Sequence, residues 1–302
     1  MTAVAERKPA HAPADLRRSS LPLRRRFVDA LMKSLMVLAL LIALVPLGLV
    51  IYYVVQRGAS IMSWAFLTEN IPNRPRIIGP GMGPAVAGTL AITGMAALMA
   101  IPLGVLGAIY LNEYGKQRRL ARIIRTMADV MTGVPSIVMG LFVYVTLVLV
   151  VKEKTGFAAS IALACLMLPV IIRSTEEMLR LVPDELRQAS AALGSRQWRT
   201  TVSVVLPAAI SGITSGAMLA VARAAGETAP IVVVAGATNI LNWDIFHGEN
   251  TSLAAQIFKS ATEPNEGSQQ RAWGAALTLM LIVLVFTVAA RLIANRFAIK
   301  ER

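Results

Sequence analysis

The sequence predicts an all-α integral membrane protein with six transmembrane helices. Of its 302 residues, 56% are hydrophobic and only 16% are charged, and the mean hydropathy is +0.62. Several apolar runs exceed the roughly 20 residues that an α-helix needs to cross a bilayer. We expect spans near residues 34–55, 84–111, 126–151, 157–182, 206–236 and 272–297.

Residues 1–33 precede the first span. They carry eight Lys and Arg residues together with Pro9, Pro13 and Pro22, a composition typical of a disordered basic tail. A cleavable signal peptide is the alternative, but the apolar stretch that follows is too long and lacks a small-residue cleavage site. We therefore expect the first span to remain as a membrane anchor and residues 34–302 to form one transmembrane domain.

Basic residues fall unequally on the two predicted sides of the membrane. Of the 30 Lys and Arg residues, 22 lie in the tail, in segments 112–125 and 173–205, and at the C-terminal end of the chain, whereas 7 lie in the other connections. Cytoplasmic loops carry the basic excess in membrane proteins, which predicts that both termini are cytoplasmic. The same bias accounts for the net charge of +13, so that this charge does not indicate a nucleic-acid partner. The expected surrounding partner is membrane lipid.

The sequence also contains two long connections and very few cysteine and histidine residues. Loops 56–83 and 237–271 are long enough to pack or to dock an external partner. The chain has one cysteine, Cys165, and two histidines far apart in sequence, His11 and His247, so that we expect no disulfide framework and no metal site.

The cytoplasmic connection between the fourth and fifth spans, residues 183–205, contains no membrane-length apolar run. Pro183 and the two acidic residues after it favour a helix start, and Gly194 can end the helix in a left-handed conformation. Leu186, Ala189 and Leu193 fall on one face of such a helix. A short helix that a second protein can grip is one interpretation.

A second helix is expected to follow this joint. It begins after Ser195 and runs to Leu206-Pro207, which leaves Gly194 as the hinge between the two helices. An amphipathic helix lying on the membrane surface is the alternative interpretation of the first segment.

Two charged residues, Arg223 and Glu227, lie inside the fifth predicted span. Each isolated charge at the membrane centre costs on the order of 3 kcal/mol. Their i, i+4 spacing permits mutual neutralisation, which is the purely structural interpretation. The functional interpretation is a substrate pathway, because the planar guanidinium group matches two oxygens of a tetrahedral oxyanion.

Pro135 and Ser136 interrupt the third predicted span. Proline lacks an N–H and disturbs the helix, and the freed carbonyl and the serine hydroxyl can line a hydrated path. A packing kink without any role in transport is the alternative.

Several segments resemble the permeases of ABC importers. Gln188-Ala189-Ser190, Gly194 and Leu206-Pro207 follow the Glu-Ala-Ala, Gly and Leu-Pro pattern of their EAA loop, with Gln188 and Ser190 replacing the usual Glu and Ala. The segment 223–230, Arg-Ala-Ala-Gly-Glu-Thr-Ala-Pro, is similar to the signature of the phosphate-specific PstA family. Segments 101–104, 108–114 (Ala-Ile-Tyr-Leu-Asn-Glu-Tyr) and 133–141 also resemble that family.

This resemblance implies the ABC type I importer permease fold, with a core of about 84–297 and a coupling loop at 183–205. It implies two sets of functional residues. The substrate pathway would use Arg223, Glu227, Thr228, Ser136 and Pro135. The docking site for the ATPase would use Arg187, Gln188, Ala189, Ser190, Leu193 and Gly194.

The resemblance also implies a heteromeric importer of inorganic phosphate in the bacterial cytoplasmic membrane. The partners would be a homologous permease (PstC-like), two copies of a cytoplasmic ATPase (PstB-like) and an external phosphate-binding protein (PstS-like). The chain has no GxxxxGK[ST] phosphate loop, so that we expect no catalytic residues, metal or cofactor in it and ATP bound by a partner. An importer of sulfate, molybdate or phosphonate, an intramembrane enzyme and a passive channel are the alternatives.

Overall fold

The computed structural model describes residues 23–74, 76, 81–115 and 118–297, which form helices and connections without a β-strand. The chain divides into two units, residues 1–52 and 53–302, which we describe separately. The first holds most of α1 (Leu23–Gly58). Residues 23–33 are therefore helical, in contrast to the predicted disordered tail, because the apolar helix continues into the basic segment; residues 1–22 lie outside the described residues.

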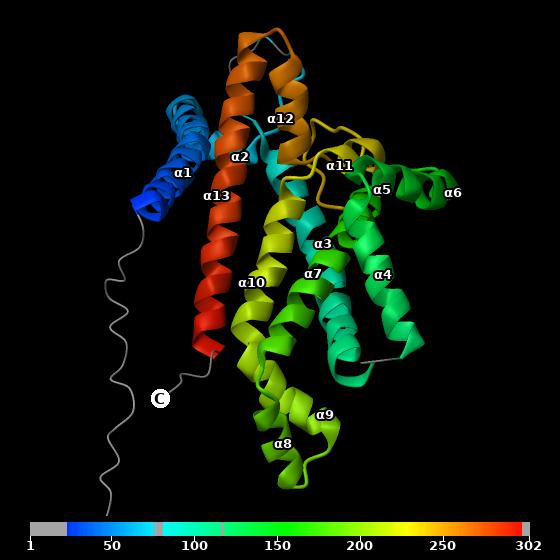
Figure 1. The fold of residues 1–302 in the computed structure, drawn as a ribbon. Helices are drawn as coiled ribbons and strands as arrows, with labels where there is room; N and C mark the ends of the chain where they lie inside the picture. The colour runs from blue at the N-terminus through cyan, green and yellow to red at the C-terminus, as the bar shows by residue number, and fades with distance from the viewer. Residues whose placement is uncertain (1–22, 75, 77–80, 116–117, 298–302) are drawn as a thin grey trace, which may run out of the picture. The chain divides into compact units, whose positions relative to one another are not determined.

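Four long helices of the second unit lie side by side (Figure 1). They are α3 (Gly83–Ile109), α7 (Gly156–Leu181), α10 (Leu206–Ala225) and α13 (Glu266–Phe297). Small residues permit the close packing of α3 on α7: Ala96 and Ala100 are fully buried, and a Cβ atom at Gly104 would lie 2.6 Å from the Ile171 side chain. Close approach at small residues is how helices associate in membranes, where lipid competes for apolar surface.

The third predicted span, 126–151, is not one continuous helix. The structure has α4 (Arg119–Gly133), α5 (Ser136–Val143), the π-turn η3 (Tyr144–Val148) and α6 (Leu149–Val151), with a bend of 107° between the two halves. Val134 is extended because the ring of Pro135 disfavours helical backbone before it, and Pro135 supplies no N–H. The described residues thus contain five helices able to span a membrane, or six if the bent pair counts as one.

The fifth predicted span, 206–236, is also divided. Helix α10 ends at Ala225 with Gly226 as its C-cap, and α11 (Ala229–Val234) follows after a turn. Glycine weakens a helix and Pro230 restricts the residue before it, so that the chain breaks here. Glu227 therefore lies in this turn, beyond the helix that carries Arg223.

Two helices lie in connections that were expected to be loops. They are α2 (Trp64–Thr68) and α12 (Leu253–Thr262), and α12 packs against α13. Each begins at a serine whose side chain accepts a backbone N–H three residues on, Ser63 from Phe66 and Ser252 from Ala255. Both capping serines are helix-start signals that can be read in the sequence.

The connection at residues 183–205, here called the elbow, has the predicted form. It consists of α8 (Asp184–Ala192), α9 (Gln197–Thr200) and the π-turn η4 (Thr201–Val205), which continues into α10. Gly194 adopts a φ of +77°, the left-handed conformation that ends α8. The elbow extends beyond the joined ends of α7 and α10 (Figure 1).

Candidate functional site: a charged cavity and an elbow

A cavity of about 190 Å³ lies between α4, α5, α7 and α10. Its lining is Met131, Thr132, Val134, Pro135, Ser136, Leu166, Met167, Pro169, Val170, Ala220, Arg223, Ala224 and Glu227. Among these residues only Arg223 and Glu227 are charged. The breaks in the third and fifth spans therefore lie at one cavity. The sequence of each span alone does not show that the two breaks are neighbours.

The two charged side chains form a loose ion pair. Arg223 Nε lies 3.7 Å from Glu227 Oε1, which exceeds hydrogen-bond length. The Arg223 side chain is 70% exposed, whereas that of Glu227 is 18% exposed. Glu227 is thus a partly buried acceptor, and the terminal NH₂ groups of Arg223 remain open to an oxyanion.

The other predicted pathway residues divide into two groups. Pro135 and Ser136 line the cavity, where Pro135 is the N-cap of α5 and Ser136 is its first residue. The first N–H groups of a helix lack intrahelical acceptors and form its positive end, which favours an anion in the cavity. Thr228 does not line the cavity; it is the N-cap of α11, and its carbonyl accepts from Val232 N.

Ion pairs between α4 and α7 were missed by the sequence analysis. Glu176 is 2% exposed and accepts from Arg125 Nε at 2.8 Å and from Arg180 Nη2 at 2.6 Å. Asp129 and Arg173 form a second pair between the same two helices. Arg125 and Glu176 are 51 positions apart in the sequence, so that their pairing depends on how the two helices pack.

The outer face of the elbow is exposed and partly apolar. Gln188, Ala189 and Gly194 are exposed, and Leu193 is 87% exposed. Trp198 on α9 is also exposed. Four of the six predicted docking residues are therefore accessible to another protein.

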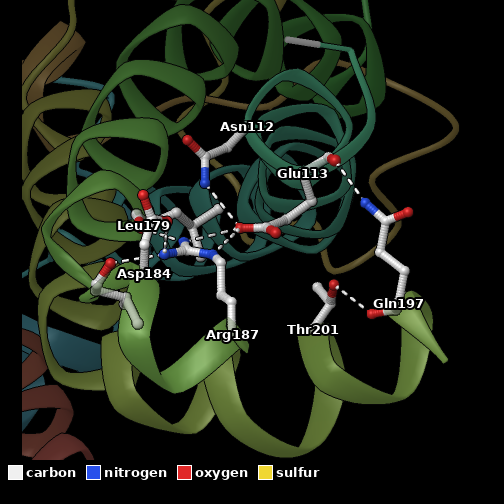
Figure 2. Close-up of polar contacts among 8 residues, drawn as sticks. Asn112, Glu113, Leu179, Asp184, Arg187, Gln197 and Thr201 are labelled. Carbon is white, nitrogen blue, oxygen red and sulfur yellow. Dashed lines mark hydrogen bonds and ion pairs between the residues drawn. The ribbon is translucent and has the colours of Figure 1, made fainter. Parts of the chain in front are cut away.

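The inner face of the elbow holds the other two predicted docking residues. Ser190 is buried and shares a 2.9 Å hydrogen bond with the Thr200 hydroxyl, which joins α8 to α9. The Arg187 guanidinium contacts Glu113 and lies among the residues drawn in Figure 2. Arg187 and Ser190 are three residues apart and so lie on the same face of α8.

A family model for the inner membrane component of binding-protein-dependent transport systems matches residues 100–299. The chain belongs to this family. The match begins inside α3 and continues through the cavity, the elbow and α13. It confirms the predicted class of protein, a membrane component of an importer.

Curated relatives are similar over most of their length. The phosphate transport system permease protein PstA 1 of Mycobacterium tuberculosis (strain H37Rv) is 41% identical over 287 residues, which cover 93% of this chain and 92% of the relative. The PstA protein of Yersinia pestis is 40% identical and covers 81% and 82%. That of Haemophilus influenzae is 36% identical and covers 89% and 94%. The similarity to PstA permeases is therefore confirmed.

Solved structures with a similar fold are membrane transporters. An inward-facing MetNI methionine ABC transporter matches with a TM-score of 0.56 and 20% identity, and the match covers 72% of this chain and 95% of that one. A bacterial ABC transporter involved in the import of alginate matches with a TM-score of 0.56 and 11% identity, covering 91% and 100%. At these identities the likeness confirms the ABC importer permease fold.

Proposed function

We propose that this chain is the permease subunit of an ATP-driven importer and passes inorganic phosphate across the bacterial inner membrane, with both termini in the cytoplasm. The observation that supports phosphate as the substrate is the position of the Arg223 guanidinium, which lines the cavity beside Glu227. The names of the relatives, phosphate transport system permease proteins, support the same substrate.

The cavity combines features that suit a partly protonated oxyanion. The guanidinium offers two parallel N–H donors to two oxygens. Glu227 repels a fully ionised anion, but its carboxylate accepts a hydrogen bond from a protonated oxygen. Near neutral pH phosphate keeps a proton and sulfate does not, so that the pair favours phosphate over sulfate.

The elbow is the proposed docking site for the ATPase subunit. Its exposed outer face, with Gln188, Ala189, Leu193 and Gly194, fits a groove on a cytoplasmic ATPase. The ATPase binds ATP, and this chain performs no bond chemistry. The full assembly comprises this chain, a homologous permease, two ATPase copies and an external phosphate-binding protein.

Transport then proceeds by alternating access. Closure of the ATPase moves the elbow, and the elbow moves α7 and α10, to which it is covalently joined. Because α7 and α10 both line the cavity, their movement changes the side of the membrane to which Arg223 is open. Pro135, Ser136 and Thr228 complete the proposed pathway, the last at the turn beside α11.

The first prediction concerns Arg223. In cells that depend on this importer, Arg223→Ala should abolish phosphate uptake, and Arg223→Lys should lower it by about tenfold to a hundredfold, because Lys keeps the charge but loses the bidentate geometry. Radioactive phosphate uptake measures both variants. Immunoblots of the membrane fraction and co-purification with the ATPase establish insertion and assembly.

A matched control is Arg291→Lys, which alters an arginine on α13 that does not line this cavity. Uptake of that variant should equal that of the wild type. Normal uptake by an assembled Arg223→Ala variant would exclude Arg223 from the pathway.

A further inference from the structure

Glu113 lies in the Asn-Glu-Tyr segment at the cytoplasmic end of the second span, and the proposed pathway gives this segment no role. It belongs to the π-turn η2 (Tyr110–Tyr114) that extends α3. Its side chain is 7% exposed. A nearly buried carboxylate that does not line the cavity requires other partners, because an unpaired buried charge is strongly destabilising.

The principal partner of Glu113 comes from the elbow. Arg187 on α8 donates from Nη2 to Glu113 Oε1 at 3.0 Å and from Nε to the same oxygen at 3.3 Å. The Arg187 side chain is only 17% exposed. Residues 74 positions apart are thus joined by one buried ion pair, which Figure 2 shows at its centre.

The same guanidinium also holds the start of α8 to the end of α7. Its Nη2 donates to Leu179 O at 2.9 Å, and its Nη1 donates to Val182 O at 2.6 Å and to Asp184 Oδ1 at 3.1 Å. Arginine is suited to this position because its rigid fork can serve several acceptors at once. Arg187 therefore fixes three segments, α7, α8 and η2, at one point.

The second arm of the elbow reaches the same residue. Gln197 on α9 donates from Nε2 to the backbone carbonyl of Glu113 at 2.7 Å. The neighbouring Asn112 donates to Glu113 Oε1 at 2.8 Å. Both helices of the elbow are thus bound to η2 through Glu113 (Figure 2).

We propose that Glu113 and Arg187 form a mechanical anchor that makes η2 move with the elbow, so that the stroke of the ATPase reaches α3 as well as α7 and α10. Arg187 is then a positioning residue inside the permease and not a contact to the ATPase. This inference rests on the proposed function, because it assumes an ATPase that moves the elbow.

The geometry explains why an anchor is needed. The chain joins the elbow directly to α7 and α10, but α3 is separated from it in sequence and makes its extensive contact with α7. In a partly buried ion pair with several hydrogen bonds, the two side chains stay together when one of them is displaced. An exposed pair, by contrast, exchanges its partners with water. Without the anchor, the elbow would tilt while η2 stayed behind.

The first test compares coupling in the complete complex. The assembled importer, with Glu113→Gln or Arg187→Gln in this chain, is placed in proteoliposomes with the phosphate-binding protein, and ATP hydrolysis and phosphate uptake are measured together. We expect the ATP consumed per phosphate to rise at least about tenfold in both variants, with no further rise in the double variant. Arg187→Lys should restore part of the coupling because it keeps the charge.

Asp184→Asn is the matched control. Asp184 is the exposed partner of the same guanidinium, with 77% of its side chain exposed, and the substitution removes its charge while it keeps an acceptor oxygen and the Glu113–Arg187 pair. This variant should keep the wild-type ratio. Wild-type coupling in an assembled Glu113→Gln complex would overturn the inference.

The second test does not depend on the substrate. Spin labels at Glu185→Cys on α8 and Tyr114→Cys on η2, in a chain with Cys165→Ser, report the distance between the two elements in the nucleotide-free and nucleotide-trapped complex. We expect the same distance in both states, and a change between them once Glu113→Gln is added. A distance that changes without that substitution would overturn the anchor, whereas absent phosphate uptake by the wild-type complex would refute only the proposed function.

Discussion

At the scale of single residues, the cavity depends on the difference between two oppositely charged side chains. Arg223 is mostly exposed and Glu227 is mostly buried, and their 3.7 Å separation leaves the guanidinium short of a hydrogen bond to the carboxylate. A tightly paired arginine would have satisfied its donors within the chain. The loose pair therefore leaves the guanidinium able to donate to a further acceptor.

Glu227→Gln tests the discrimination between oxyanions. The amide keeps an acceptor oxygen but loses the negative charge, so that we expect phosphate uptake to fall by about tenfold while sulfate becomes a competitor. Competition of unlabelled sulfate against labelled phosphate measures the change. Glu227→Asp, which keeps the charge, should still exclude sulfate; unaltered uptake and selectivity in Glu227→Gln would remove this residue from the mechanism.

At the scale of elements, the connections at the end of the bundle opposite the elbow are interlocked. Asn250 Oδ1 accepts from Gly156 N at 2.9 Å, and the ring of Phe157 packs against that of Phe246 at a tilt of 39°, with ring centroids 5.0 Å apart. Asp244 in the same segment accepts from Phe246 N at 2.8 Å and pairs with His247. The loop predicted at 237–271 is thus an ordered surface that is held to the start of α7.

The His247–Asp244 pair gives this surface a pH dependence. The hydrogen bond to Asp244 raises the pKa of His247 above its ordinary 6.5, and the bond to His247 lowers the pKa of Asp244. The stabilisation by the charged pair is complete below the ordinary pKa of the histidine. It is lost as the pH rises through the raised pKa, and at the acid end as the pH falls through the lowered pKa of Asp244.

Asp244→Asn should therefore return the pKa of His247 toward its ordinary value. NMR titration of labelled histidine in a His11→Gln chain, which leaves His247 as the single histidine, measures it. Asp29→Asn, a change in a different unit of the chain, is the control and should not move the pKa. An equal pKa with and without the Asp244 carboxylate would contradict the assigned cause.

At the scale of the whole molecule, the exposed apolar side chains of the elbow imply that the chain functions in an assembly. Leu193 is 87% exposed and Leu186 is 43% exposed, although both lie outside the long apolar helices. Exposed apolar groups on a polar connection between membrane helices mark a contact with a partner protein.

Leu193→Glu should release the ATPase, because a charge placed in an apolar groove loses its hydration without gaining a partner. Co-purification of the ATPase with this chain should fall by more than about tenfold, and phosphate uptake should be lost with it. Leu193→Met keeps the apolar volume and should behave as the wild type. Undiminished ATPase binding by an inserted Leu193→Glu chain would place the docking surface elsewhere.

The sequence by itself determined the class of protein, the approximate spans and the form of the elbow. Apolar runs of membrane length have few alternatives, because lipid leaves the backbone no partner except its own helix. The stop at Gly194 was predictable for a similar reason, since glycine reaches a left-handed φ at little cost. Arg223 and Glu227 were identifiable as candidates because charge in an apolar run is costly.

Only the tertiary structure decided how these parts meet. The sequence showed Pro135, Gly226 and Pro230, but not that the third and fifth spans break there completely and place their ends around one cavity. It also assigned Arg187 to the docking surface, whereas the fold turns this side chain inward to Glu113. The physical reason is that periodicity fixes the face of a helix on which a residue lies, while its partner depends on packing between segments far apart in the chain.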